Sequence, residues 1–593
     1  MAEPLKLKSG KTLVPARSNP SPEDSKPSPL WLKGYEPSIA TSPDTFVGFA
    51  EYLRWMRSPD AFAKDLANST KLEILQLAAQ KATTYKQRLE VLTSRTKRIA
   101  GEDNNTFEVT STWRIRVGGQ RGPESMLLPA WDALGIPYIP SSTLRGVARD
   151  RAIREFMKDG MEYQEATAAI APYFGSIDSS TPKEDRMGKV VFLDAYPVPS
   201  NSGALAVDLA NNIWKWEGNL PKYGASPFPF LSLVKPTFTI GIKPTQKCDD
   251  KTFHKIKGWL IAGLQSGIGS QVNSGYGELL EAGSVNSTQK EILRTNFILE
   301  GQLIHGVQKI IPGQKYAQSQ SELRPIAFRS MLRYWFRIFA LGVLPSDEVK
   351  NWEAKLFGSI DSSPTHGWIG VHILEQECKP SLPDVSGKQS GTLILRYSNS
   401  APVDLHDAIY KLCRHLTWLM FNLGGVGQGA RRPLHQRSRF PKCRGSKLQI
   451  VNEKYQPFSL TKSLLQKSLK ELYLALATLI GRPIDYRSLI RTSVNQSSFT
   501  EAIDGNCCIL ICERKSDNNK PYALSILHSQ EFKYNGNYDP ELCGKMQKPS
   551  PVWICNNAEY QVVTIFGANI GKRKKYVEKL LADGNTIQIF PMQ

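Results

Sequence analysis

Arginines recur at helical spacing in two places along the chain. Arg145 and Arg149 are four residues apart, and Arg329, Arg333 and Arg337 repeat that interval. Residues four apart lie on one face of a helix. A helix N-terminus offers free N–H groups, and a guanidinium can bind two phosphate oxygens at once. The spacing therefore predicts phosphate binding, and the alternative is a solvated helix face with ordinary ion pairs.

Hydroxyl side chains come directly before the first arginine pair. Ser141, Ser142 and Thr143 follow Pro140, a pattern typical of a helix start. We expect these hydroxyls to donate to the same phosphate groups as the arginines. The second arginine series has no such hydroxyl run, but Pro325 again marks a helix start before it.

Two later segments are rich in glycine, SGIGSQVNSGYGEL and GGVGQGARRPLHQRSRF. Glycine lets backbone amides approach an anion closely. Neither segment has the spacing of a nucleotide-binding P-loop or of a dinucleotide fingerprint. The expected anion contacts in these two segments are Gly267, Gly269, Asn273, Gly425, Gly427, Arg431, Arg432, Arg437 and Arg439.

The overall charge agrees with an anionic partner. The 593 residues carry 75 Lys and Arg against 55 Asp and Glu, for a net charge of +20. Residues 408–452 contain no acidic residue, which favours a groove wall that follows a nucleic-acid backbone. Nucleic acid is the first expectation, and an acidic membrane surface or acidic protein is the second. A soluble protein with a basic surface is the plain alternative.

Catalytic and metal sites are not indicated. The nine cysteines form no CxxC pair and the eight histidines are isolated, so we expect reduced, packed thiols, no metal and no cofactor. Asp132 and His305 are weak catalytic candidates, but no acid–base pair is visible beside them. An aspartate in a loop is more often a turn former. No apolar run is long enough to cross a membrane.

The elements that position these residues are written twice. The string FGSIDSS occupies residues 174–180 and recurs 183 residues later at 357–363. Each copy follows an arginine-bearing helix and precedes an apolar strand and a glycine-rich segment. This order indicates two homologous domains in tandem.

The repeated heptapeptide is expected to join a helix to a strand. Its Phe should close a helix and pack inward, and its Gly should supply a left-handed helix stop. Direct ligand contact by Ser176 and Asp178, or by Ser359 and Asp361, is the alternative.

The strand and helix order predicts an α+β protein with two tandem ferredoxin-like (RRM-like) domains. Strands are expected from Thr106, Gly188 and Asn296, and a buried strand at CCILIC, with helices over 143–158, 325–339 and 464–480. The predicted layout is a basic Pro/Ser-rich arm (1–45), a helical extension (46–103), a first domain (104–290), a second domain (294–450) and a C-terminal α+β region packed on the second domain (451–593).

Several of these motifs resemble a known superfamily. PYIPSSTLRG is similar to the PYIPGSSLRG signature of RAMP-superfamily subunits in type III CRISPR effector complexes, with Ser141 in place of the glycine. The first domain, with GKVVFLDAYP, FPFLSLVKP and NSGYGEL, resembles the sixth-subunit family of the Cmr (type III-B) complex. The second, with ELRPIAFRSMLRYWFR, LFGS and GGVGQGARRP, resembles the first-subunit family. The resemblance covers about residues 100–593.

The resemblance implies RAMP domains that bind a CRISPR guide RNA (crRNA). It implies a non-catalytic structural subunit in antiviral defence, capping the backbone filament near the 3′ end of the guide. The expected partners are crRNA, target RNA and the backbone, small and large subunits of a cytoplasmic complex, with no membrane. Two alternatives stay open: an RNA-cleaving subunit, for target slicing or guide processing, and a general single-stranded RNA-binding protein.

Overall fold

The computed structural model describes residues 85–592, together with 72, 75, 76 and 79, apart from a set of internal segments. These segments are 119–127, 134, 179–180, 200–204, 212, 225–226, 285–288, 310–317, 360–364, 381–384, 438–442, 452–461, 488, 490–500, 514–519, 546–547 and 558–559. The predicted arm over 1–45 and most of the predicted helical extension lie outside the described residues.

The first unit is a βαββαβ fold. In chain order it contains β1 (Thr106–Ser111), α4 (Ser141–Lys158), β3 (Val190–Phe192), β8 (Thr237–Pro244), α7 (Asp250–Ser266) and β9 (Leu279–Glu281). The strands form one antiparallel sheet in the order β3-β8-β1-β9. Inward side chains of the sheet share a core with α4 and α7, among them Val109, Phe238, Leu144 and Leu260.

The second unit repeats this topology. It contains β10 (Glu291–Gly301), α8 (Pro325–Ala340), β13 (Ile369–Lys379), β14 (Gly387–Tyr397), α10 (His406–Leu423) and β17 (Ser446–Ile450). The sheet order is β13-β14-β10-β17, so the first strand again lies between the third and the fourth. Burial alternates along β10 as expected for a strand with one covered face. Helix α9 (Ser346–Phe357) leads into the second copy of the heptapeptide.

A third unit of the same topology follows, which sequence analysis had not distinguished within the predicted C-terminal α+β region. It contains β18 (Cys508–Cys512), α12 (Tyr522–Leu527), α13 (Pro540–Cys543), β21 (Val552–Asn556), β22 (Gln561–Ile565), α14 (Gly571–Leu581) and β23 (Thr586–Phe590). The sheet order is β21-β22-β18-β23, the same arrangement once more. Helix α11 (Lys462–Ile480) packs against α10 and links the second unit to the third.

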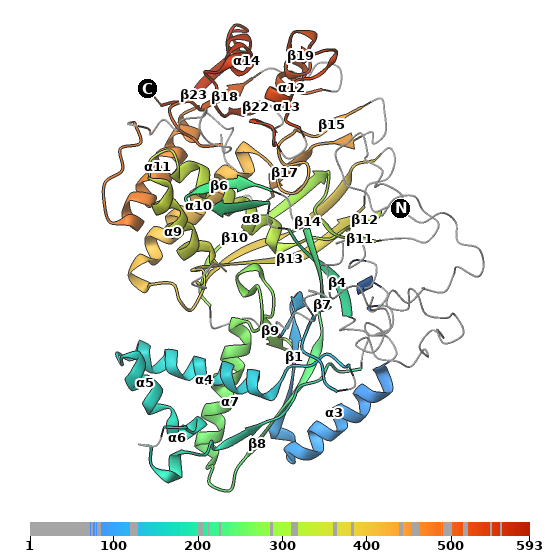
Figure 1. Ribbon diagram of the computed structural model, residues 1–593, viewed down its shortest axis with the longest axis vertical. Coiled ribbons are helices and arrows are strands. Elements are labelled where there is room, and N and C mark those ends of the chain that lie inside the picture. The colour runs from blue at the N-terminus through green and yellow to red at the C-terminus, as the bar shows by residue number, and fades with distance from the viewer. Residues whose placement is uncertain are drawn as a thin grey trace, which may run out of the picture.

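The three units are stacked end to end along the long axis of the molecule, from the first at the bottom to the third at the top (Figure 1). The first unit has an insertion in the chain between β3 and β8, and this insertion extends upward in Figure 1. It forms β4 (Leu205–Asn211), β5 (Trp214–Glu217), β6 (Leu220–Tyr223) and β7 (Pro227–Val234), with β2 (Arg114–Ile115) pairing with β7. The β5–β6 hairpin lies against the helices of the second unit (Figure 1).

Smaller elements complete the description. They are α3 (Lys86–Ala100), α5 (Tyr163–Ala169), α6 (Ala171–Phe174), β11 (His305–Lys309), β12 (Gln318–Ser321), β15 (His435–Gln436), β16 (Cys443–Arg444), β19 (Lys533–Tyr534) and β20 (Asn537–Tyr538). Helix α3 packs on β8. Within the described residues, no helix combines the length and apolar character that a bilayer span requires.

The α+β class and the duplicated order are confirmed. All five residues of β18 are buried, as the CCILIC run predicted. The conformation predicted for the heptapeptide glycine is wrong in one respect. Gly175 and Gly358 have positive φ, but their ψ values of 160° and 154° are extended rather than left-handed helical. The chain therefore continues from the end of each helix in an extended conformation, into the segment before the next strand.

Candidate nucleic-acid interface

The N-terminus of α4 presents part of the predicted phosphate site to solvent. Ser142 and Arg145 are exposed, Thr143 is half-buried, and the first turn has no acidic residue. The backbone N–H of Ser141 donates to Asp194 Oδ1 at 2.7 Å, so one of the free amide groups is already capped. The remaining face keeps the hydroxyl and guanidinium donors that the sequence predicted.

Arg149 lies one turn further along the same face and is half-buried. Within the described residues it makes no hydrogen bond and no ion pair. Arg154, on the next turn, differs because it pairs with Asp150 at 2.7 Å. Like Arg145 and Arg151 of the same helix, Arg149 therefore has no carboxylate paired with it among the described residues.

Arg145 and Arg329 make equivalent hydrogen bonds in the first and second units. Arg145 Nη2 donates to the backbone carbonyl of Phe174, and Arg329 Nη2 donates to that of Phe357. Each arginine thus ties its helix to the Phe that opens the FGSIDSS string. Burial, and then repulsion from Arg333, lowers the pKa of Arg329 to about 10. The matched arginines have a packing role that the spacing did not reveal.

The other two arginines of α8 are engaged by one carboxylate. Arg333 Nε lies 2.5 Å from Glu353 Oε1, and Arg337 binds the same carboxylate through Nε at 2.6 Å and Nη2 at 2.7 Å. The Arg337 side chain is 2% exposed. Burial raises the pKa of Glu353, but attraction by the two arginines outweighs this and the pKa falls below its ordinary value. In this conformation α8 offers a phosphate strand little free charge.

The first glycine-rich segment is a contact between units. Gly267 and Gly269 have positive φ, and a Cβ on Gly269 would collide with the carbonyl of Arg116 in the same unit. Asn273 donates through Nδ2 to the carbonyl oxygens of Gly367 at 2.8 Å and Ile369 at 3.2 Å in the second unit. The close approach that glycine permits is therefore to protein backbone, and the Asn273 amide is used at the boundary.

The second glycine-rich segment makes the corresponding contact with the third unit. A Cβ on Gly425 would lie 2.5 Å from Ser446 Oγ, and Gly427 has a φ of 83°. Arg431 pairs with Glu501 at 2.6 Å. Arg432 donates to the carbonyl of Val552 at 2.7 Å, and burial lowers its pKa.

The acid-free segment 408–452 is only partly a surface. Its first half is α10, whose Leu412, Leu416 and Met420 are fully or almost fully buried. The lack of acidic residues there has a packing cause. Arg437 is half-buried, and Arg439 lies outside the described residues.

The two weak catalytic candidates lie in different units. Asp132 sits in a turn before α4, where its Oδ1 accepts the N–H of Ile136 at 2.9 Å. His305 lies at the start of β11 in the second unit. The described residues contain no cluster of three or more His, Cys, Asp or Glu side chains suited to a metal ion.

Sequence reasoning missed a buried charge network between the first two units. Asp208 is fully buried and accepts hydrogen bonds from Tyr276 at 2.6 Å, Ser232 at 3.0 Å and Arg324. Arg114 lies 3.8 Å from the same carboxylate. These residues are far apart in the chain, and no local pattern joins them.

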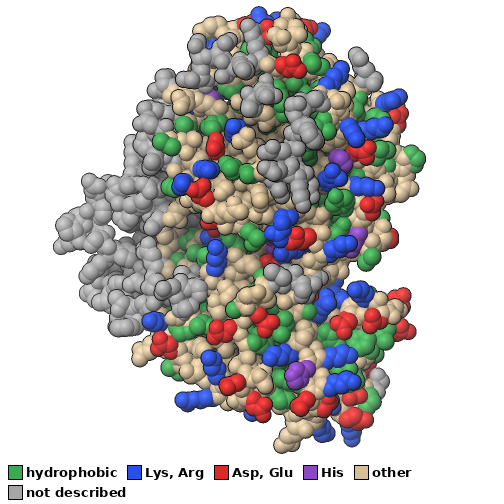
Figure 2. All heavy atoms as spheres, turned by 180° about the vertical axis from the view of Figure 1, so that it is seen from behind, with side chains coloured by type: hydrophobic (Ala, Val, Ile, Leu, Met, Phe, Trp, Pro, Cys, Tyr) green, Lys and Arg blue, Asp and Glu red, His purple; other side chains and the backbone are tan. Residues whose placement is uncertain are grey.

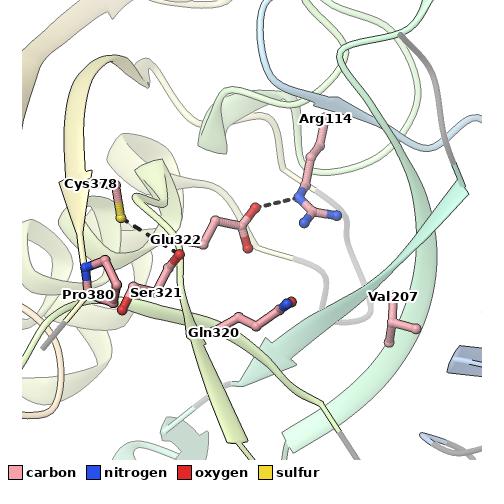
Figure 3. Close-up of a pocket in the computed structure, with 7 residues that line it drawn as sticks. All are labelled: Arg114, Val207, Gln320, Ser321, Glu322, Cys378 and Pro380. Atoms are coloured by element: carbon pink, nitrogen blue, oxygen red, sulfur yellow. Dashed lines mark hydrogen bonds and ion pairs between the residues drawn. The ribbon is translucent and has the colours of Figure 1, made fainter. Parts of the chain in front are cut away.

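A hollow of about 530 Å³ lies beside this network (Figure 3). Arg114 of the first unit points toward Glu322 of the second, with 2.7 Å between Nε and Oε1. Val207, Gln320, Ser321, Cys378 and Pro380 complete the lining. Because its one arginine is already paired, the hollow adds little to an anion site.

Helix α3 is a second missed feature. Its five basic side chains are exposed and its one acidic residue is Glu90. The basic residues are Lys86, Arg88, Arg95, Lys97 and Arg98. On the face shown in Figure 2, basic and acidic side chains are interspersed rather than gathered into one patch.

Comparison with known proteins identifies the first unit. Residues 106–280 match the model of the RAMP superfamily. The first unit is therefore similar to domains of the RAMP superfamily. The matched residues run from the start of β1 into β9, so they include the PYIPSSTLRG motif, the first heptapeptide and the first glycine-rich segment. The resemblance to the RAMP superfamily predicted for this part of the chain is confirmed.

Two solved structures are similar to parts of the chain. A chain of the type III-B Cmr-beta complex bound to cognate target RNA, solved by cryo-EM, is 18% identical with a TM-score of 0.26; the match covers 39% of this chain and 85% of that one. The crystal structure of Cmr6 from Pyrococcus furiosus is 18% identical with a TM-score of 0.20, covering 30% of this chain and 96% of that one. None of the curated proteins matches the chain.

Proposed function

We propose that this protein is a guide-RNA-binding structural subunit of a type III CRISPR RNA-targeting effector complex, at the end of the backbone filament that holds the 3′ end of the guide. The RAMP domain over 106–280 supports the class of protein. The net charge of +20 supports a polyanionic partner.

The observation that carries the RNA-binding part is the open face of α4. Ser142 is exposed at a helix N-terminus without acidic residues, and Arg149 has no counter-charge among the described residues. The free N–H groups and dipole of a helix start favour a phosphate group there. We propose that Ser142, Thr143 and Arg149 contact the guide backbone.

The corresponding helix of the second unit fits this role less well. Arg333 and Arg337 share the Glu353 carboxylate, and Arg329 bonds to Phe357 and to Ser274 of the first unit. A phosphate would have to displace a buried ion pair, and leaving one partner of such a pair uncompensated costs about 3–5 kcal/mol. The proposed contacts are therefore concentrated in the first unit.

The proposed subunit binds RNA without cutting it. The carboxylate of Asp132 holds a turn, and His305 belongs to another unit. General acid–base cleavage needs two groups within reach of one ribose. An Asp132→Ala variant incorporated into the purified effector complex is expected to leave target cleavage unchanged, and lost cleavage would favour the RNA-cutting alternative.

The test of RNA binding is a salt titration of the full-length protein with a synthetic fluorescent single-stranded RNA. Arg149→Glu should weaken binding at low salt and reduce the slope of log K against log salt by at least about 0.7, the value for one lost phosphate contact on a single strand. Sequencing the RNA that co-purifies from the native cell would identify it as guide.

Arg154→Glu is the matched control, because Arg154 lies on the same helix with the same charge but is paired with Asp150. It should change the slope much less. Equal effects of the two reversals would reject α4 as the contact and leave only a general effect of net charge. RNA of random sequence and length in the native pull-down would favour a general RNA-binding protein.

A further inference from the structure

In each of the three units the segment in front of the second strand begins at a glycine in the same backbone conformation. The segment begins with Gly175, Gly358 or Gly544, all at positive φ with ψ between 154° and 171°. A Cβ built on these glycines would lie 2.8 Å, 3.1 Å and 2.5 Å from one backbone nitrogen further along the chain. Those nitrogens belong to Gly188, Gly367 and Ser550, which are therefore equivalent, as are Val190, Ile369 and Val552 two residues later.

The first glycine-rich segment docks on this place in the second unit. Asn273 donates to the carbonyl oxygens of Gly367 and Ile369, which face the open edge of β13. Gly275 lies against the next carbonyl that points outward, that of Val371. A Cβ built on Gly275 would be 3.0 Å from the Val371 oxygen. One loop thus covers the edge of the neighbouring sheet.

The second glycine-rich segment docks on the equivalent place in the third unit. Arg431 donates to the carbonyl of Ser550 at 2.5 Å and Arg432 to that of Val552 at 2.7 Å. Gly424 lies over the ring of Trp553, which is 2% exposed. Different side chains in different units therefore reach the same pair of backbone acceptors.

Among the described residues, no loop lies on this edge of the first unit. The carbonyl of Lys189 accepts the N–H of Thr245 beside β8, so the carbonyls of Gly188 and Val190 point away from the sheet, because successive carbonyls alternate along a strand. Within the described residues no donor reaches them. Val191, the counterpart of Trp553, is 49% exposed.

The surroundings of this edge match those of the covered one. Arg329 donates through Nη1 to Ser274 of the docked loop at 3.2 Å, whereas its counterpart Arg145 is exposed. Ile177 and Met187, in the turn before β3, are exposed to 107% and 73%. An apolar rim and the exposed guanidinium of Arg145, which is bonded through Nη2 to the Phe174 carbonyl, surround two acceptors that no described donor uses.

A second copy of this chain cannot supply the missing loop from its described residues without losing a contact of its own. Asn273 and the Arg431–Arg432 pair already hold the second and third units. In the third unit, α14 and β23 are joined by residues 582–585 alone, too short for a glycine-rich arm. Within the described residues, the first unit therefore has an acceptor edge and the third unit has no donor loop.

We propose that the edge of β3, together with Met187 and Gly188 before it, docks the glycine-rich loop of another ferredoxin-like protein, a loop that follows the second helix of its unit and carries an amide or guanidinium donor. This deepens the proposed function, since it places the chain as the terminal member of a row of such proteins. Head-to-tail contacts of this kind extend until one member lacks a donor or an acceptor.

The test places the photo-crosslinking residue p-benzoylphenylalanine at Val191 of the full-length protein, expressed in its native host. After irradiation, the cross-linked peptides of the purified assembly are sequenced by mass spectrometry. We expect a cross-link to another protein, at a residue of the loop between its second helix and last strand. Val403, a surface valine of the second unit that is 74% exposed, is the matched control position and should not give that peptide.

Three outcomes would overturn the proposal: a cross-link to a different segment of a partner, a cross-link to residues 1–71 of this chain, or a cross-link to RNA. A second pair of variants tests the docking without photo-crosslinking. Val191→Glu should lose the partner from the purified assembly, and Val403→Glu should retain it. Cross-linking is repeated after ribonuclease treatment. A failure of RNA binding at α4 can then be distinguished from a failure of docking at β3.

Discussion

The indole Nε1 of Trp216 donates to Glu353 Oε1 at 3.1 Å across the boundary between the first and second units. The same carboxylate pairs with both Arg333 and Arg337, and the Arg337 guanidinium lies 5.4 Å from the centre of the Trp216 ring. The β5–β6 hairpin of one unit therefore completes an ion cluster inside the other. This cluster ties the first and second units together at their boundary.

Glu353→Gln should loosen this boundary strongly. Glutamine keeps the shape of the side chain but removes the negative charge that Arg333 and Arg337 share. Removing one partner of a buried ion pair costs about 3–5 kcal/mol. The measurement is hydrogen exchange over α8, α9 and the β5–β6 hairpin. Glu348→Gln is the control on the same helix, because Glu348 is paired with Arg482 at the surface, where a salt bridge contributes about 0–1 kcal/mol. Equal effects of the two changes would contradict the role of the cluster.

Asn273→Ala should separate the boundary role of this residue from the RNA contact that the sequence predicted. Two hydrogen bonds to buried backbone carbonyls are lost, and each contributes about 0.5–1.5 kcal/mol. We expect faster hydrogen exchange along β13 and an unchanged salt slope of RNA binding. Asn399→Ala is the control, because Asn399 bridges to Ser266 of the first unit at an exposed position. A reduced salt slope of RNA binding for Asn273→Ala would instead support the predicted contact between Asn273 and RNA.

The duplicated fold could be predicted because its first two copies still share letters. In both copies the Phe of FGSIDSS is bonded by an arginine of the unit's first long helix, α4 or α8, and the next residue is a glycine at positive φ. Of these seven letters the third copy keeps only the glycine, Gly544, and Cys543 stands in place of the Phe. The backbone requires glycine at one position, while the rest of the turn is free to change. The distance from this glycine to the second strand also shortens from unit to unit, which hides the repeat from a search at fixed spacing.

The arginines were placed correctly on helices, but their partners could not be predicted. Spacing shows that Arg333 and Arg337 share a helix face, yet it cannot show that Glu353 of the following helix lies against that face. The same limit applies to Arg431, whose carboxylate partner is seventy residues further along the chain. Tertiary contacts decide whether a guanidinium is free for a ligand, and among the predicted arginines Arg149 is the clearest case without a carboxylate in the described structure.

Gly544→Ala should destabilise the third unit by more than the backbone strain alone. Its φ of 74° and ψ of 171° belong to a region that costs other residues about 1–3 kcal/mol, and the new Cβ would stand 2.5 Å from the Ser550 nitrogen. Gly584→Ala is the control in the same unit, since Gly584 has a φ of 71° but nothing within 4 Å of its Cβ position. The comparison is made by thermal unfolding and by exchange along β21. A smaller effect at Gly544 than at Gly584 would contradict the shared turn.

His528 should make the third unit sensitive to mild acid. Burial, followed by repulsion from Arg432 and Lys520, lowers the pKa of His528 to about 3. Between this value and the ordinary histidine pKa of 6.5, the unfolded chain binds a proton that the folded chain does not. The free energy of unfolding should therefore be fully retained above pH 6.5 and fall by at most about 1.4 kcal/mol for each pH unit below it.

The measurement is hydrogen exchange along β18 and β22 between neutral pH and pH 4.5, corrected for the intrinsic exchange rate. His528→Gln should flatten the pH dependence, because the amide has no proton to gain over this range. The exposed residue His254 provides the control, and His254→Gln should leave the dependence on pH in the third unit as it is. If His528→Gln and the unmodified protein lose protection in parallel on acidification, other groups drive the loss. Because His528 lies close to Arg432, flattening in the variant would also link proton uptake to the loop that holds the second and third units together.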